Sequence, residues 1–281
     1  MSTLYAGPSG ANVSERAQLP PSLAVSTVIF GLKPSRAAGK PTLWLPLVRR
    51  VKEPFKGQWA LPGGPLTATE SLEDTARRNL RDTTGLAPEY LEQLYAFGGL
   101  DRANRPGRSA QRVVSIVYWA LVRPTEAELL VEGRGGTENV AWHRADTAGQ
   151  DEGGLAFDHR EIIDYALWRL RNKIEYAQIA YHFLGETFTL AELREVYEAV
   201  LGRALDPANF RRQLKSVPQI EATEEFLEGG RHRPPRLYRY TGPPAPYPTS
   251  SGPPFSADQP AAHTLASPQS AVPHPAPRST P

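Results

Sequence analysis

The sequence predicts an α+β chain with two structured parts, a strand-rich sandwich followed by a helical unit that ends in a hairpin. Three observations lead to this prediction. Runs of β-branched and apolar residues recur up to residue 143, with one helical segment between them. Helical periodicity takes over near residue 159, and two short strands follow the helices. Finally, 40% of the 281 residues are hydrophobic, which is enough for two cores of ordinary size.

Five strands are expected in the first part. They cover residues 23–30, 42–48, 94–97, 112–122 and 138–143. The fourth of them, RVVSIVYWALV, is almost entirely apolar, which is typical of a strand that is covered on both faces. Residues 69–84 are expected to form one covering helix, and a second helix is expected to begin near His159. Together these elements predict a layered sandwich.

Two helices are expected to open the second part. The first covers residues 160–184 and carries apolar residues at helical spacing on one face. The second begins at Thr189, which forms a capping box with Glu192 three residues later. Gly202 is expected to end this helix, because glycine adopts the left-handed conformation that closes many helices.

A third helix and a hairpin complete the second part. Asp206 is a good N-cap and Pro207 suits the first helical position, so a helix is expected from there to Val217. Strands are expected at residues 220–227 and 236–241, on either side of a Gly-Gly turn. Three helices followed by a hairpin form the element order of a winged helix-turn-helix.

Composition excludes several classes of protein. The chain has no cysteine, so disulfides and thiolate sites are excluded. Its formal net charge is only +2, so any nucleic-acid signal must be local. The N-terminus lacks the pattern of a secretory signal, and no apolar run approaches the roughly 18 residues of a membrane span. We therefore expect a cytoplasmic protein without a membrane partner.

These observations divide the chain into four regions. Both ends are rich in proline and small residues, and we expect them to be disordered because such segments bury too little apolar surface to offset their ordering entropy. The expected regions are a disordered N-terminus at 1–21, a sandwich domain at 22–158, a linking helix with the winged helix at 159–241, and a proline-rich tail at 242–281.

Residues 63–86 carry a long motif. They read GGPLTATESLEDTARRNLRDTTGL and follow the segment FKGQWALP. In this spacing the chain resembles the Nudix box, and the positions in register are Gly64, Glu70, Arg78, Leu80, Gly85 and Leu86. The resemblance implies a Nudix α/β/α sandwich for the first domain, and hydrolysis of a nucleoside diphosphate derivative where the box is complete.

The box is incomplete at its metal ligands. The three helix carboxylates of the family fall on Asn79, Asp82 and Thr83, whose spacing would place them on one helix face. Magnesium needs anionic oxygen ligands, and only Asp82 supplies one. Arg78, four residues before Asp82, is well placed to pair with it. We therefore predict no catalytic residues, with Glu70, Arg78 and Asp82 as remnants of the box, no metal site and no required cofactor; Mg²⁺ is expected only if hydrolysis is retained.

Another interpretation of this helix is structural. Leu72, Ala76 and Leu80 would be core residues under any function, and Asp74, Arg78 and Asp82 could form a solvated row of ion pairs. That interpretation leaves the Gly-Gly pair, Gly85 and the lead-in unexplained.

A nucleotide pocket can remain after its chemistry is lost, because arginines bind a diphosphate without a metal. Trp59 or Phe55 could stack on a base, although both residue types also suit a core. Each arginine taken alone could equally be a solvated surface residue. The candidate ligand residues are Arg49, Arg50, Trp59, Gly63, Gly64, Arg78, Arg102 and Arg108, with Arg105 and Arg112 nearby.

The third helix and the hairpin concentrate basic charge. In the helix, Phe210, Leu214 and Val217 have the spacing of a buried face, so the polar residues lie outside. Arginine, asparagine and glutamine can read base edges, and arginine and lysine bind phosphates. The candidate DNA-binding residues are Asn209, Arg211, Arg212, Gln213, Lys215, Arg231, Arg233 and Arg236, with His232 and Arg239 beside them. The alternative use of this domain is protein contact through a solvated basic face.

Over residues 20–241 the chain resembles the Nudix-related regulators of NAD metabolism, the NrtR type. The most specific segments are LAFDH at 155–159, FTLxxL at 188–193, DxxNFRR at 206–212 and RPxxLY at 233–238. The resemblance implies a homodimeric repressor of NAD biosynthesis or salvage genes. Such a protein binds a palindromic operator in double-stranded DNA and leaves it when ADP-ribose or a related nucleotide binds. Two alternatives remain: a Nudix hydrolase of ADP-ribose, and an interaction protein that uses the proline-rich tail.

Overall fold

The computed structural model describes residues 21–34, 39–99, 102, 112–123, 139–150, 154–176, 179–227 and 234–242. The expected disordered segments lie outside this part of the chain, apart from residue 21 and residue 242. No described helix is long and apolar enough to cross a membrane.

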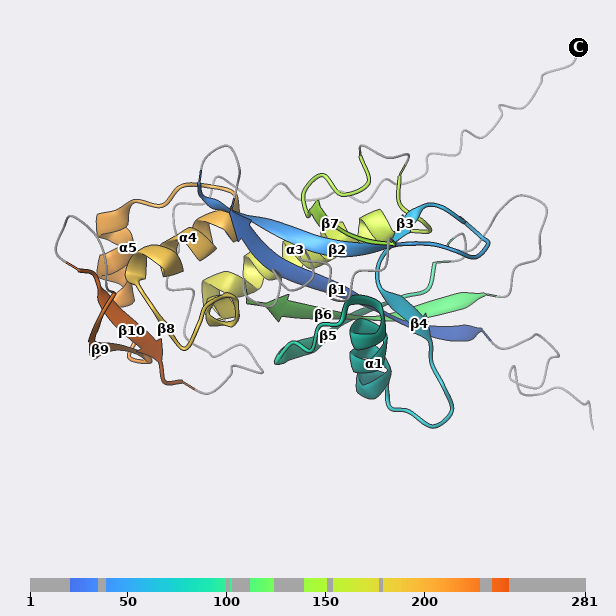
Figure 1. The fold of residues 1–281 in the computed structure, drawn as a ribbon, viewed down its shortest axis with the longest axis horizontal. Helices are drawn as coiled ribbons and strands as arrows, with labels where there is room; N and C mark the ends of the chain where they lie inside the picture. Colours follow the sequence, from blue (N-terminus) through green and yellow to red (C-terminus); the bar gives the residue numbers. More distant parts are fainter. Residues whose placement is uncertain are drawn as a thin grey trace, which may run out of the picture.

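A seven-stranded sheet forms the first domain (Figure 1). Its central strands β1 and β6 are parallel, and their register runs from Ser22 opposite Val113 to Gly31 opposite Val122. The other pairings are antiparallel, in the order β3-β2-β1-β6-β5, with β4 paired to β1 and β7 to β2. The strands are β1 (Ser22–Pro34), β2 (Pro41–Arg49), β3 (Trp59–Ala60), β4 (Gly63–Pro65), β5 (Tyr90–Phe97), β6 (Val113–Val122) and β7 (Val140–Arg144).

Both faces of the sheet are covered, as the apolar run in β6 predicts. Alternate residues of β6 point to opposite faces. Tyr118 and Ala120 pack with residues of helix α1 (Leu72–Thr84), whereas Trp119 and Leu121 belong to the larger core that includes helix α3 (His159–Tyr176). The predicted α/β/α sandwich is confirmed.

Helix α3 carries the chain from the sheet to the second domain. Figure 1 shows it crossing the sheet from β7 toward α4. One face is fully buried, and its residues are Ile162, Ile163, Ala166, Leu167, Leu170 and Ile174. The prediction of one helix over 160–184 is wrong in its second part: the helix ends at Tyr176, and a separate 3-10 turn, η3, covers Ile179–Phe183.

The second domain has the expected winged helix order. The helices α4 (Leu190–Leu201) and α5 (Pro207–Leu214) follow η3, and the sheet order is β8-β10-β9. Its strands are β8 (Thr187–Phe188), β9 (Ile220–Phe226) and β10 (Arg236–Tyr240). The predicted capping box is present, because Thr189 Oγ1 accepts from the Glu192 amide and the Glu192 carboxylate accepts from the Thr189 amide. Gly202 ends α4 in the left-handed conformation, as predicted.

Helix α5 ends at Leu214, one turn before the predicted Val217. The amides of Ser216 and Val217 donate to carbonyls three residues earlier, so the last turn is tightened rather than α-helical. Pro218 has no amide hydrogen, so it cannot donate to the Leu214 carbonyl and extend the helix. Lys215 is consequently the C-cap and not an interior residue of the helix.

Candidate functional site

The Nudix-box segment, residues 63–86, contains strand β4, which packs closely against β1, and helix α1. Strand β4 pairs with β1, with Gly63 opposite Ser26 and Gly64 opposite Val25. A Cβ on Gly63 would lie 2.7 Å from the Val25 carbonyl oxygen, and one on Gly64 would lie 2.9 Å from Asn79 Oδ1. Real Cβ atoms do not approach backbone that closely, so Gly63 requires glycine, whereas a larger residue at position 64 would have to displace the Asn79 side chain. Ser71 then caps α1 by accepting from the Asp74 amide.

Glu70 is held by Arg78. The Arg78 guanidinium donates to the two Glu70 oxygens at 2.7 and 2.9 Å, and the Thr67 and Thr75 hydroxyls also donate to this carboxylate. The Arg78 bonds hold the pKa of Glu70 down to about 2. Arg78 lies 3.8 Å from Asp82, so the predicted pair exists, but Glu70 is the closer partner. The predicted helix start at residue 69 is wrong, because Ser71 is the N-cap and α1 begins at Leu72.

The expected common face of positions 79, 82 and 83 is not formed by their side chains. Asn79 is buried and its amide donates to the Val25 carbonyl at 3.3 Å, whereas the Asp82 side chain is 61% exposed. The Thr83 hydroxyl donates back to the Asn79 carbonyl. Among the described residues, no three acidic or histidine side chains gather to hold a metal ion. The residues present therefore do not fit the magnesium that a complete Nudix box implies.

A cavity of about 170 Å³ opens beside the box glycines. It brings together four of the predicted ligand residues, Arg50, Gly63, Gly64 and Arg102. Its other walls contain residues not expected to bind, including Leu61, Phe157 and His159. Arg50 and Arg102, beside the backbone of Gly63 and Gly64, form a site that can bind an anion.

Arg102 is the more buried of the two arginines. Its side chain is only 5% exposed, and its Nε lies 2.6 and 2.7 Å from the two oxygens of Asp158. One terminal nitrogen donates to the Phe97 carbonyl at 3.0 Å. Arg50 lies over the ring of Phe157, with its Cζ 4.6 Å from the ring centroid. The cationic wall is therefore held in place by residues of the 155–159 segment.

The segment LAFDH joins the cavity to α3. Its Ala156 amide donates to the Trp59 carbonyl at 2.8 Å, and Phe157 has a positive φ of 56° that aims its ring at the cavity wall. His159, the first residue of α3, accepts from the Leu61 amide through Nδ1 at 2.9 Å. Phe157 and His159 were not predicted as cavity residues, because the segment was identified only through its resemblance to a known family. No pattern within the segment indicates that it returns to the sheet beside Trp59.

The third helix presents the polar face that the sequence predicts. Phe210 and Leu214 are buried, while Asn209, Arg211 and Arg212 are exposed. Arg212 donates to Asn209 Oδ1 at 2.8 Å, which leaves the Asn209 amide group facing outward as a donor. The Arg211 side chain makes no hydrogen bond to any described residue, so its guanidinium is available to a partner.

In the described part of the hairpin, Arg236 is engaged within the protein. Arg236 donates to the Thr223 carbonyl at 2.7 Å and to Glu224 at 3.1 Å, so it ties β10 to β9. Arg239 is exposed on β10. Arg231, His232 and Arg233 lie outside the described residues.

Each of the two domains matches a known protein family. The family described as NUDIX domain matches residues 25–166, and that described as NrtR DNA-binding winged helix domain matches residues 180–240. The chain is 32% identical over 222 residues to an Acinetobacter baylyi protein named ADPR responsive transcriptional repressor NtrR, which covers 78% of this chain and 82% of the relative. This chain belongs to the NrtR family. A crystal structure of Shewanella oneidensis NrtR complexed with a 27mer DNA has 31% identity and a TM-score of 0.64, and covers 78% of this chain and 93% of that one.

The Nudix domain of this NrtR-family chain also resembles enzymes. It is 31% identical over 127 residues to a Methanocaldococcus jannaschii protein named ADP-ribose pyrophosphatase, which covers 44% of this chain and 66% of the relative. The fold alone therefore does not separate a regulator from a hydrolase, and the residues of the box must be considered for this chain.

Several predicted ligand residues of this NrtR-family chain do not line the cavity. Arg49 donates to the Gly57 carbonyl at 3.1 Å and lies over Trp59, which is only 8% exposed and belongs to the core. Phe55 packs edge-on against Phe157 at 4.8 Å. Arg78 is engaged by Glu70, and Arg112 donates to the Gly98 carbonyl at 3.0 Å. Arg105 and Arg108 lie outside the described residues.

His159 makes the stability of the NrtR-family sandwich dependent on pH. Burial, and then the charges of Arg102 and Arg50, lower the pKa of His159 to about 3 from the usual 6.5. The unfolded chain therefore takes up a proton below about pH 6.5 that the folded chain refuses, so the His159 contribution to stability is complete above pH 6.5 and is lost as the pH falls toward 3.

We expect His159→Asn, whose amide oxygen can accept from Leu61 in place of Nδ1, to reduce this dependence. Between pH 6 and pH 5 the free energy of unfolding should fall by on the order of 1 kcal/mol more in the native chain than in the variant. Urea unfolding at each pH measures the difference. If the free energy of unfolding fell equally in the two proteins between pH 6 and pH 5, His159 would not be held neutral in the folded chain.

Proposed function

We propose that this chain is an ADP-ribose-responsive transcriptional repressor of NAD biosynthesis or salvage genes. It binds a palindromic operator as a homodimer, with one α5 helix in each half-site. The named function of the Acinetobacter relative and the DNA complex of the Shewanella protein support this proposal. The exposed Arg211 and Arg212 on α5 supply the chemistry, since guanidinium groups bind phosphates and guanine edges.

One observation carries the regulatory part of the proposal: the cavity and the winged helix share helix α3. His159 lines the cavity and is the first residue of α3, while Arg171, near the other end, donates to the Val200 carbonyl of α4 at 3.2 Å. The 18 residues of α3 span about 27 Å at 1.5 Å per residue. A change at the cavity can thus move α4 as a rigid unit with α3.

The ion pair of Arg102 and Asp158 is the point at which the ligand acts. A diphosphate that enters the cavity competes with Asp158 for the guanidinium, because both offer anionic oxygens to the same donors. Asp158 directly precedes α3, so weakening this pair changes how the start of α3 is held. Two α5 helices must match half-sites about 34–36 Å apart, and the ligand releases DNA by favouring a geometry that does not.

We propose that the cavity binds its ligand without hydrolysing it. The cavity is smaller than the roughly 300–1,000 Å³ of typical ligand sites, so the phosphate-bearing part of the ligand would enter it and the rest would extend outward. No metal is required for this binding, because Arg50 and Arg102 supply the positive charge. The competing function, pyrophosphohydrolysis, is favoured by the Methanocaldococcus relative and would require cation ligands at positions where this chain has Asn79 and Thr83.

A gel shift tests the proposed function directly. The DNA is a duplex containing a palindrome from upstream of the chain's own gene or its neighbours, and a scrambled duplex of equal length is the control. We expect retardation of the palindrome alone at physiological salt, and its loss on addition of ADP-ribose. Equal binding of both duplexes, or of neither, would contradict operator recognition.

A further inference from the structure

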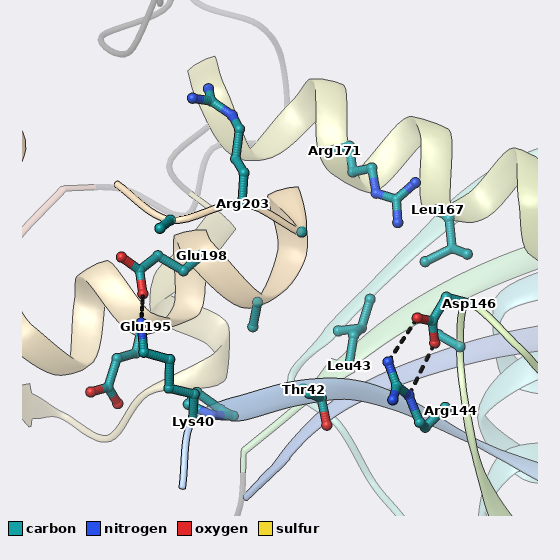
Figure 2. Close-up of a pocket in the computed structure, with 15 residues that line it drawn as sticks. Lys40, Thr42, Leu43, Arg144, Asp146, Leu167, Arg171, Glu195, Glu198 and Arg203 are labelled. Carbon is teal, nitrogen blue, oxygen red and sulfur yellow. Dashed lines mark hydrogen bonds and ion pairs between the residues drawn. The ribbon is translucent and has the colours of Figure 1, made fainter. Parts of the chain in front are cut away.

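A second and larger cavity lies at the junction of the two domains (Figure 2). Its volume is about 330 Å³, which falls within the range of small-molecule sites. The start of β2 and the turn after β7 form one side, and α3, α4 and the turn after α4 form the other. The proposed gating uses one residue of this cavity, Arg171, through its bond to Val200, but it places no ligand here.

The cavity has an apolar floor and a charged rim. Leu43 and Leu167 provide apolar surface from β2 and α3. Lys40 donates to Glu198 at 3.1 Å and so joins β2 to α4 across the opening. On the opposite side, Arg144 pairs with Asp146 at 2.9 Å. Each of these ion pairs is neutral as a whole, so the remaining charged residues of the lining are Arg171, Glu195 and Arg203.

Arg171 is the cation that remains available. Its Nε donates to the Val200 carbonyl near the C-terminus of α4, which restrains the guanidinium at one of its three nitrogens. Within the described part of the chain, its two terminal nitrogens have no hydrogen-bond partner. Figure 2 shows the guanidinium directed from α3 toward Leu43 and the Arg144–Asp146 pair. A guanidinium held in this way presents two parallel donors to a carboxylate or a phosphate.

We propose that the junction cavity is a second ligand site, which binds a small organic anion with one carboxylate or phosphate group and a short apolar body. The anionic group binds the terminal nitrogens of Arg171, and the apolar body lies against Leu43 and Leu167. The volume accommodates a small metabolite and the rim contacts both domains, so the bound anion holds α4 against the start of β2. If the proposed DNA binding is correct, occupation of this site also changes operator affinity.

Calorimetric titration of the full chain tests the site without DNA. The probes are phenyl phosphate and benzoate, which share an apolar ring and differ in the anionic group. We expect at least one of them to bind with a Kd of about 1 mM or tighter, and Arg171→Met to weaken that binding about 10-fold or more. The comparison of the two probes tells whether phosphate or carboxylate is preferred.

The matched control is Arg169→Met, on the same helix two residues earlier and outside the cavity lining. It should bind the probes as the native chain does. Arg171→Lys keeps the charge but loses the two parallel donors, and it should be intermediate; it serves if Arg171→Met fails to fold. Absence of binding by both probes at about 10 mM, or equal binding by the native and Arg171 variants, would overturn the proposal. Because this readout needs no DNA, it can fail while the repressor function stands.

Discussion

Arg211→Ala is expected to weaken operator binding about 30-fold or more while leaving ADP-ribose binding unchanged. Arg211 is exposed on α5 and its side chain makes no hydrogen bond to a described residue, so removing the side chain disturbs no described hydrogen bond. One base or phosphate contact is worth about 1–3 kcal/mol, and a homodimer loses it twice. Arg212→Ala should act similarly and also free Asn209, which it contacts at 2.8 Å. Fluorescence anisotropy with a labelled operator measures both.

Arg81→Ala is a suitable control for the two variants. Arg81 is an exposed arginine in the last turn of α1, so its removal changes the net charge equally but lies in the Nudix domain. Its operator affinity should stay within about threefold of the native value, as expected for a change in distant surface charge. If all three variants bound DNA as tightly as the native chain, α5 would not be the reading helix.

Arg102→Met is expected to weaken ADP-ribose binding by about 10-fold to 150-fold. It is also expected to weaken operator binding without ligand, because it removes the same Arg102–Asp158 ion pair on which the ligand is proposed to act. The Arg102 side chain is 5% exposed and lines the cavity, so it would make charge-assisted hydrogen bonds worth about 1.5–3 kcal/mol to a bound phosphate. Calorimetry with ADP-ribose gives the affinity, and the ligand concentration that releases DNA should rise by the same factor.

Arg102→Lys is a second variant, which separates loss of ligand binding from loss of folding stability. Removing Arg102 leaves the largely buried Asp158 without its partner, which can destabilise a fold, whereas lysine keeps the charge. Lysine cannot bind two oxygens in parallel, so we expect an intermediate loss of ADP-ribose affinity. Arg112→Met is the matched control, since Arg112 is exposed and lies outside the cavity lining. Unchanged ligand affinity in both Arg102 variants would place the effector elsewhere.

Much of the fold follows from local patterns in the sequence. The capping box at Thr189, the left-handed Gly202 and the N-cap Asp206 each act through neighbouring residues, so the spacing alone locates the helix ends. The short strands β3, β4 and β8 were missed because two or three residues carry no periodicity. Their pairing depends on partners far along the chain, such as Val25 for Gly64.

The cavity was predicted only in part, for a similar reason. Arg50, Gly63, Gly64 and Arg102 were expected from the box and from charge, and the structure brings them together. The roles of Phe157 and His159 depend on a return of the chain to the sheet about 100 residues after β3, which no local pattern encodes. Similarly, Arg49 and Arg78 were candidate ligand residues, and Arg78 was expected to pair with Asp82, yet the Gly57 carbonyl and Glu70 engage them.

The central claim is that occupation of the Nudix cavity releases DNA without chemical turnover. One sample tests it: labelled operator bound to the native chain, with Mg²⁺ and ADP-ribose present, followed by anisotropy while chromatography measures ADP-ribose and AMP. We expect anisotropy to fall to that of free DNA at saturating ADP-ribose, with the ADP-ribose recovered intact. Retention of the operator at saturating ADP-ribose, or release that proceeds only as AMP accumulates, would contradict the claim.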